Sequence, residues 1–296
     1  MYYRKKILLA LLESFPGKMD RLRFQKLLFL LNTRLETPVY YFLPYRYGCF
    51  SFQANAECVA LEKNGHITTG DSSWTVNGNE SWLFSLNEND RKTVRELAKE
   101  FEAYTDDDLI RYTYERYPFY AIKSNIAHKY LNAQGMENVA AATPKATKQA
   151  LFTLGYEGLF LEQYINLLLK HDVKLLLDVR KNAMSMKYGF SKKTLQTACE
   201  NVDIVYEHCP EVGIVSDKRK NLQTQADYDY LFADYRATVL KQTEQVQVEM
   251  CIKIENARRA ALLCFEKMPQ MCHRSHLAVS LSRHFTTPIQ LQHLHG

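Results

Sequence analysis

The first part of the chain has the hydrophobic spacing of helices. Apolar residues recur at helical intervals in residues 3–14 and again in residues 21–34, where Asp20 stands at the position of a helix cap. The same reasoning predicts helices over 52–63, 87–104, 106–116 and 119–131, with short strands near 66–69 and 74–76. We therefore expect residues 1–131 to form a mostly helical domain.

Residues 132–149 show no apolar period and are rich in small and polar side chains. This composition is typical of a linker between domains. The chain has 296 residues, and domains usually contain about 100–200 residues. We therefore expect two domains, with the linker at 132–149.

From residue 150 to residue 296, apolar strand-like runs alternate with amphipathic stretches. Leu175, Leu176 and Leu177 form an unbroken apolar run, which is typical of a strand buried on both faces of a parallel sheet. The alternation predicts strands near 151–154, 173–179, 203–207, 260–264 and 287–294, and helices near 161–168, 191–200, 227–246 and 272–283. We expect an α/β domain with a mainly parallel sheet.

The composition constrains the cellular compartment and the possible partners, but it does not identify a function. The net charge is +5, which permits a nucleic-acid partner but does not require one. No apolar run approaches the roughly 20 residues that a membrane-spanning helix needs. The seven cysteines show no spacing typical of a disulfide framework. These features predict a cytoplasmic protein with free thiols and no membrane contact.

Three strand ends in the second domain carry polar residues. These are the turn that begins with Gly155 and Tyr156, the segment Asp178-Val179-Arg180, and the segment from Cys264 to Arg274. In parallel α/β sheets, ligands bind where strand carboxyl ends meet helix amino ends. If the strands are parallel, all three segments leave the sheet at one end, and we expect a site there.

The segment from Cys264 to Arg274 carries the most specific candidates. Cys272, His273 and Arg274 would lie in the first turn of a helix, where free backbone N–H groups favour an anion. Arg274 would add bidentate recognition of a phosphate or carboxylate, and His273 would be a polar site residue or a helix cap. Cys272 or Cys264 is a possible nucleophile, although Cys264 also suits a small core residue at a strand end.

Asp178 and Arg180 are two residues apart, so both point the same way from the strand end. They form either a local salt bridge or a functional pair in which Arg180 meets phosphate. In the functional pair, Asp178 or Glu266 would handle a proton.

Two basic loops are candidates for a nucleic-acid surface. Lys218, Arg219 and Lys220 lie on one polar loop, and Lys192 and Lys193 lie on another. They form either a track for a phosphate backbone or merely solvated loops. A zinc site near Cys272 and Cys209 lacks the paired-cysteine spacing that would define its ligands, so we predict no metal and no cofactor.

The second domain resembles the bacterial family known as domain of unknown function number 488. The resemblance covers nearly the whole domain and rests on several motifs: Thr153-Leu-Gly-Tyr-Glu-Gly158, Leu177-Asp-Val-Arg180, Gly189-Phe-Ser191, Tyr206-Glu-His208, Pro210-Glu-Val-Gly213, Leu262-Leu-Cys-Phe-Glu-Lys267, Cys272-His-Arg-Ser275 and Gln292-His293-Leu294. Asn182-Ala183 stands where the family usually has Asn-Pro. The resemblance implies an α/β fold, a cleft that contains Cys, His and Arg, and frequent association with nucleic-acid processing or defence, phage defence included. It implies no established reaction.

The first domain resembles the Panacea (SocA-like) antitoxin domain. The resemblance rests on Leu22-Arg-Phe-Gln-Lys-Leu-Leu-Phe-Leu-Leu31 and on Pro44-Tyr-Arg-Tyr-Gly-Cys-Phe-Ser51, where Cys49 replaces the family's usual proline. It implies that residues 1–131 form an adaptor that binds a protein or a nucleic acid, without catalytic residues.

Three functional hypotheses follow. The first is a bacterial protein that binds or processes nucleic acid or a nucleotide through an anion-binding cleft in the second domain. The second is a regulatory sensor without catalysis, which binds a partner protein and a small anion. The third is rhodanese-like sulfur or phosphoryl chemistry at the cysteines. Whether the protein is an enzyme is left open by the sequence.

Overall fold

The protein is described by a computed structural model that covers residues 1–15, 17–78, 81–220 and 222–296. The chain divides into two compact units, Met1–Thr143 and Pro144–Gly296. Each unit has its own hydrophobic core.

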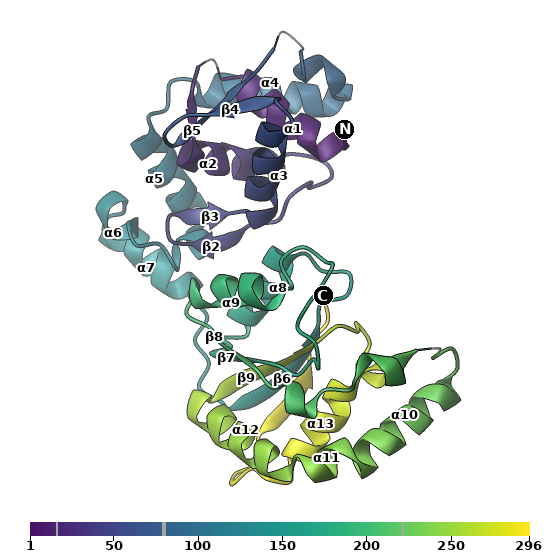
Figure 1. Cartoon of the computed structure of the whole chain (residues 1–296). Helices are drawn as coiled ribbons and strands as arrows, with labels where there is room; N and C mark the ends of the chain where they lie inside the picture. Colours follow the sequence, from purple (N-terminus) through teal and green to yellow (C-terminus); the bar gives the residue numbers. More distant parts are fainter. Residues whose placement is uncertain (16, 79–80, 221) are drawn as a thin grey trace. The chain divides into compact units, whose positions relative to one another are not determined.

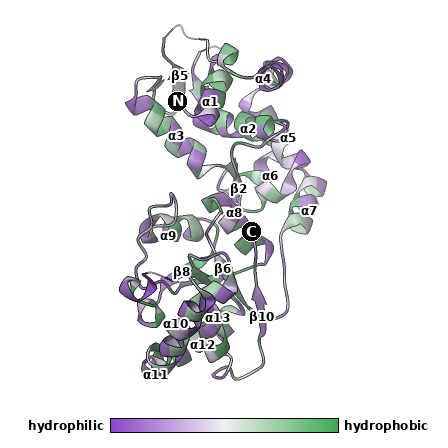
Figure 2. Ribbon diagram, turned by 90° about the vertical axis from the view of Figure 1, so that its right-hand side faces the viewer, coloured by the Kyte–Doolittle hydropathy of each residue, from purple (hydrophilic) through white to green (hydrophobic). Residues whose placement is uncertain are grey.

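The N-terminal unit is mostly helical (Figure 1). Its helices are α1 (Tyr3–Glu13), α2 (Arg21–Asn32), α3 (Phe52–Lys63), α4 (Glu88–Phe101), α5 (Asp106–Arg116), α6 (Ala127–Tyr130) and α7 (Ala133–Ala142). Short antiparallel strands complete it: β1 (Met19–Asp20), β4 (Ile67–Thr69) and β5 (Ser73–Val76) form one sheet, and β2 (Leu43–Tyr45) pairs with β3 (Gly48–Phe50). Helices α1 and α2 contribute more residues to the core than the other elements do, and Asp20 caps α2 as predicted. Helix α4 is largely hydrophilic (Figure 2) and buries only Val94, Leu97 and Phe101.

Two predictions for this unit are wrong. The expected helix over 119–131 is interrupted, because the Ser124 hydroxyl accepts a hydrogen bond from the Ile126 amide and the Asn125 amide donates to Arg46. The expected linker at 132–149 is helical over α7, which Asn132 caps. Helix α7 buries little more than Gly135 and Val139, so its sequence has no clear apolar period.

The C-terminal unit is an α/β domain with a five-stranded, all-parallel sheet. The strands are β6 (Ala150–Gly155), β7 (Leu175–Asp178), β8 (Val205–His208), β9 (Arg259–Cys264) and β10 (Gln290–His293), in the order β10-β6-β9-β7-β8. Helices α8 (Leu161–Lys170) and α9 (Lys192–Glu200) lie on one face of the sheet (Figure 1). Helices α10 (Gln225–Ala237), α11 (Val239–Gln242), α12 (Glu244–Ala257) and α13 (His273–Leu281) lie on the other face. Both faces are therefore covered, which explains why β6, β7 and β9 are buried throughout most of their length.

The single helix expected over 227–246 is broken twice. The hydroxyls of Thr238 and Thr243 donate to the carbonyls of Asp234 and Val239, four residues earlier, and the chain bends at both threonines. Such bonds from threonine to the preceding turn often bend a helix. The chain then enters α12, which has no counterpart among the predicted elements.

Candidate functional site

The predicted polar segments leave the sheet at its carboxyl end. Gly155 at the end of β6 pairs in register with Cys264 at the end of β9, and Asp178 at the end of β7 pairs with Leu263. The parallel register therefore brings the three segments side by side, as the strand pattern indicates.

Cys264, Cys272 and His273 form a buried cluster at this end of the sheet. Their sulfur atoms and a ring nitrogen of His273 all lie within 4.8 Å of one another. Cys264 Sγ is 3.6 Å from His273 Nδ1. Cys264 ends β9, while Cys272 and His273 begin α13, so the intervening loop folds the helix start back onto the strand end.

A backbone carbonyl holds the ring of His273 in place. His273 Nε2 lies 2.9 Å from the carbonyl oxygen of Val179. A carbonyl only accepts hydrogen bonds, so Nε2 carries a hydrogen and donates it. His273 Nδ1 is thereby left to face Cys264. An imidazole oriented in this way can take the thiol proton.

The two thiols differ in acidity. Burial alone would raise the pKa of Cys264, but the hydrogen bond with Cys272 and the charge of His273 hold it well below the ordinary value. Burial and the neighbouring Cys264 raise the pKa of Cys272 well above the ordinary value. The cluster therefore favours a thiolate on Cys264 and a thiol on Cys272. This is the asymmetry expected of a nucleophile beside a resolving cysteine.

Glu266 connects this cluster to the protein surface. Its Oε2 atom lies 3.3 Å from Cys264 Sγ, and its carboxylate forms an ion pair with Arg219. Glu266 and Arg219 both line a depression of about 510 Å³, together with Glu157, Leu222, Tyr228, Phe265, Met268 and Met271. Cys264 itself is fully buried and does not line the depression, so a reactant there reaches the thiol only when the Glu266 side chain moves aside.

Arg274 is engaged with the protein itself. It is fully buried, and its guanidinium donates to the carbonyl oxygens of Glu266 and Lys267. Its Nε also lies 3.4 Å from the hydroxyl of Thr153. The predicted phosphate-binding role does not fit this placement, because these donors hold the loop that follows Cys264.

Asp178 and Arg180 form a buried salt bridge, which is the simpler of the two interpretations that the sequence allows for this pair. Arg180 donates from Nε and Nη2 to the two carboxylate oxygens of Asp178. Tyr206, which the sequence did not single out for this role, donates its hydroxyl to the same carboxylate at 2.6 Å. Arg180 also donates to Tyr156 and to the Phe190 carbonyl. A proton-handling Asp178 and a phosphate-binding Arg180 therefore do not fit these contacts.

Gly155 and Tyr156 support the site from the neighbouring strand. A Cβ atom on Gly155 would lie 1.8 Å from the Glu266 carbonyl oxygen, so only glycine lets the loop after Cys264 approach β6 so closely. Tyr156 is buried and stacks on Phe190, with ring centroids 4.2 Å apart. Both residues serve packing here more directly than ligand binding.

The basic loop at 218–220 is largely neutralised by neighbouring acids. Lys218 pairs with Asp234, Arg219 pairs with Glu266, and Lys220 pairs with Asp217. Lys192 and Lys193 are exposed at the start of α9. The loop at 218–220 therefore offers less free positive charge than its sequence suggests.

The cluster also contains the ligand types of a metal site, although the sequence predicts none. Two thiols and an imidazole are ligands that Zn²⁺ and Cu⁺ favour. The hydrogen bond from His273 Nε2 to a carbonyl is the usual support of a metal-binding histidine. Three protein ligands would leave one tetrahedral position for water or substrate.

One known protein family matches part of the C-terminal unit. Residues 160–281 match the family described as Domain of unknown function DUF488. The match includes Asp178, Arg180 and the whole segment from Cys264 to Arg274, as the resemblance of this half predicts. No curated protein and no solved structure matches the chain. Among the residues described, no helix has the length and apolar character to cross a membrane.

Proposed function

We propose that the C-terminal unit carries out thiol-dependent sulfur chemistry, with Cys264 as the nucleophile and Cys272 as the resolving cysteine. The observation that supports this proposal is the buried cluster of two thiols and one imidazole, in which His273 Nδ1 faces Cys264 Sγ at 3.6 Å. Sulfur chemistry is favoured over phosphoryl transfer because Arg180 and Arg274, the nearest candidates for binding a phosphate, are buried and already bonded.

The proposed reaction has two steps. The Cys264 thiolate attacks one sulfur of a disulfide substrate, which forms a mixed disulfide and expels the other sulfur as a thiolate. That leaving thiolate takes a proton from His273. Cys272 then gives its proton to His273 and attacks Cys264 Sγ, which forms the Cys264–Cys272 disulfide and expels the second substrate sulfur as a thiolate, and this thiolate takes the proton from His273. The substrate is reduced by two electrons and the protein dithiol is oxidised. A separate thiol reductant restores the dithiol.

A disulfide probe tests this proposal on the reduced full-length chain. With 5,5′-dithiobis(2-nitrobenzoate), we expect release of two equivalents of thionitrobenzoate from this cluster and formation of the internal disulfide. Cys272→Ser should release one equivalent and retain a mixed disulfide on Cys264, located by mass spectrometry. The rapid reaction should persist below pH 8.5, the ordinary pKa of a free cysteine, because the lowered pKa keeps Cys264 ionised there.

Cys209 is a matched control for this experiment. It is also buried near a strand end, and burial raises its pKa to about 12, so Cys209→Ser should leave the rapid reaction unchanged. His273→Gln should move the pH midpoint of the rapid reaction upward. A rapid reaction that survives Cys264→Ser would contradict the proposal.

Binding of a thiophilic metal ion is a second candidate function for the same cluster. The supporting observation is the orientation of His273, whose carbonyl contact leaves Nδ1 directed at the thiols. Zn²⁺ is expected to bind the reduced chain in a one-to-one ratio and to protect both cysteines from the disulfide probe. Isothermal titration should show at least tenfold weaker binding for Cys264→Ser, Cys272→Ser and His273→Ala, and unchanged binding for Cys209→Ser. Tight binding that none of these three substitutions weakens would contradict this assignment.

The N-terminal unit fits an accessory role in this proposal. Support comes from the resemblance of residues 1–131 to Panacea domains, which implies binding of a protein or nucleic acid. Removal of residues 1–143 would test whether the thiol reactivity of the C-terminal unit depends on the N-terminal unit.

A further inference from the structure

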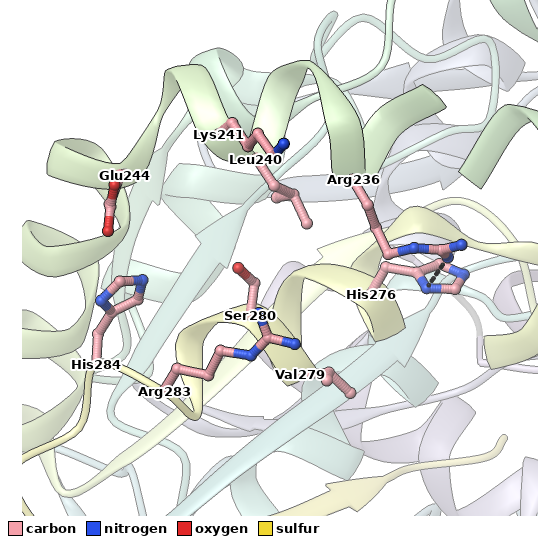
Figure 3. A pocket seen from close by; sticks show the side chains of 9 residues that line it. All are labelled: Arg236, Leu240, Lys241, Glu244, His276, Val279, Ser280, Arg283 and His284. Carbon is pink, nitrogen blue, oxygen red and sulfur yellow. Dashed lines mark hydrogen bonds between the residues drawn. The ribbon is translucent and has the colours of Figure 1, made fainter. Parts of the chain in front are cut away.

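A basic groove lies away from the thiol cluster, between two helical segments of the C-terminal unit. The end of α10 and the short helix α11 form one wall, and α13 with the turn after it forms the other (Figure 3). The cavity has a volume of about 300 Å³, and its polar lining is Arg236, Lys241, Glu244, His276, Ser280, Arg283 and His284. None of these residues lines the depression beside Glu266.

The groove carries uncompensated positive charge. Arg236, Lys241 and Arg283 line it, against a single carboxylate from Glu244. Among the residues that the structure describes, none of these three cations forms an ion pair with a carboxylate, in contrast to Lys218, Arg219 and Lys220. A concave surface that carries three unpaired cations has a positive electrostatic potential, which attracts a polyanion.

His276 helps to shape this wall of the groove. Its Nδ1 accepts a hydrogen bond from Arg236 at 3.2 Å, which Figure 3 shows as a dashed line across the groove. Burial and the positive charge of Arg236 lower the pKa of His276, so the ring is neutral near pH 7. Because Nδ1 is the acceptor, Nε2 carries the hydrogen, and the ring can donate it to a ligand oxygen.

The spacing of the polar groups suits an extended ligand. His276 lies within α13, and Arg283 follows the end of that helix, so their polar groups are spread along this wall of the groove. Arg236, Lys241 and Arg283 are all exposed. Exposed cations distributed along a groove are the usual contacts of a phosphate backbone.

We infer that this groove binds the phosphodiester backbone of a nucleic acid through Arg236, Lys241 and Arg283. The inference is independent of the sulfur chemistry proposed for Cys264. It also places the nucleic-acid surface outside the predicted segments at 192–193 and 218–220, in a part of the chain that the sequence pattern does not single out.

The test measures binding of fluorescent 20-nucleotide single-stranded DNA, single-stranded RNA and duplex DNA to the full-length chain by anisotropy at graded salt. We expect binding at low salt that weakens steeply as salt rises. The variant Arg236→Gln/Lys241→Gln/Arg283→Gln should bind at least tenfold more weakly, and its slope of log affinity against log salt should be shallower by about 2, because each lost phosphate contact contributes about 0.7–0.9.

A second triple variant removes the same charge elsewhere. Lys145→Gln/Lys148→Gln/Lys170→Gln changes exposed lysines before β6 and on α8 and should bind like the wild type. Circular dichroism should show that both triple variants melt like the wild type. Cys264→Ser should also bind normally, which separates this inference from the sulfur chemistry.

Three outcomes would overturn the inference. These are no binding to any of the three probes at low salt, equal losses in the two triple variants, and displacement of the probe by a modest excess of AMP. The last result would indicate a pocket for a free nucleotide.

Discussion

Asp178→Ala is expected to lower the free energy of unfolding of the C-terminal unit by about 3–5 kcal/mol, since it leaves the buried Arg180 without its counter-charge. Arg180 is almost completely buried, and its contacts with Tyr156 and Phe190 do not neutralise it. The Tyr206 hydroxyl would lose its acceptor as well. Calorimetric unfolding of the full-length chain measures the effect.

The tryptophans allow the two units to be separated in this measurement. Trp74 and Trp82 are the only tryptophans of the chain, and both lie in the N-terminal unit. The transition followed by tryptophan emission should therefore stay in place in Asp178→Ala, while a second calorimetric transition moves down. A shift of the tryptophan transition by the same amount would contradict independent unfolding of the units.

Two further variants test whether burial of the Asp178–Arg180 pair causes the expected loss of stability. Asp178→Leu with Arg180→Met removes both charges and should recover most of the lost stability. Asp234→Ala breaks the more exposed ion pair with Lys218 and should cost at most about 1 kcal/mol. Equal losses for Asp178→Ala and Asp234→Ala would show that burial of the Asp178–Arg180 pair does not determine its contribution.

Arg274→Ala is expected to destabilise the C-terminal unit by about 3 kcal/mol. The substitution removes the donors to two carbonyls of the loop after Cys264, and each unsatisfied carbonyl costs about 1–3 kcal/mol. For a unit of this size, the melting temperature should fall by roughly 10 °C. Differential scanning calorimetry measures the change.

Arg283→Ala is the matched control, because Arg283 follows the same helix α13 but is exposed. It should change stability by less than about 0.5 kcal/mol. Arg274→Lys keeps the positive charge but cannot present the guanidinium fork, so its stability should lie between those of the wild type and Arg274→Ala. Wild-type stability in Arg274→Ala would contradict the structural role assigned to this residue.

Arg274 also bears on the proposed chemistry. Cys264, Cys272 and His273 meet only because the loop between β9 and α13 folds back, and Arg274 bonds to two carbonyls of that loop. Stability and thiol reactivity are thus expected to decline together in Arg274 variants. In Arg236, Lys241 and Arg283 variants, both should be retained while nucleic-acid binding is lost.

Several features follow from sequence alone. The unbroken apolar run at Leu175–Leu177 predicts a doubly covered parallel strand, and β7 is such a strand, because a strand buried on both faces needs apolar side chains on both. The polar strand ends predict where the site lies, because parallel strands direct their carboxyl ends to one end of the sheet. Helix α5 lies where the sequence predicts it, and helix α9 begins within one residue of the predicted start.

Elements with weak local signals were missed for equally physical reasons. Helix α7 buries too few side chains to create an apolar period. The break at Thr238 depends on a side-chain bond to Asp234, which competes with helix continuation in a sequence otherwise suited to a long helix.

The sequence determined the fold class and the position of the candidate site, because hydrophobic periodicity and the alternation of strands and helices are properties of short segments of the chain. The partners of each polar side chain were decided only by the tertiary structure. Asp178 neutralises Arg180 and accepts a hydrogen bond from Tyr206 on the neighbouring strand, while loop carbonyls accept hydrogen bonds from Arg274. Cys264 and His273 are nine residues apart, and their contact depends on the path of the intervening loop. Such pairings are set by register and loop geometry, which residue spacing along the chain does not encode.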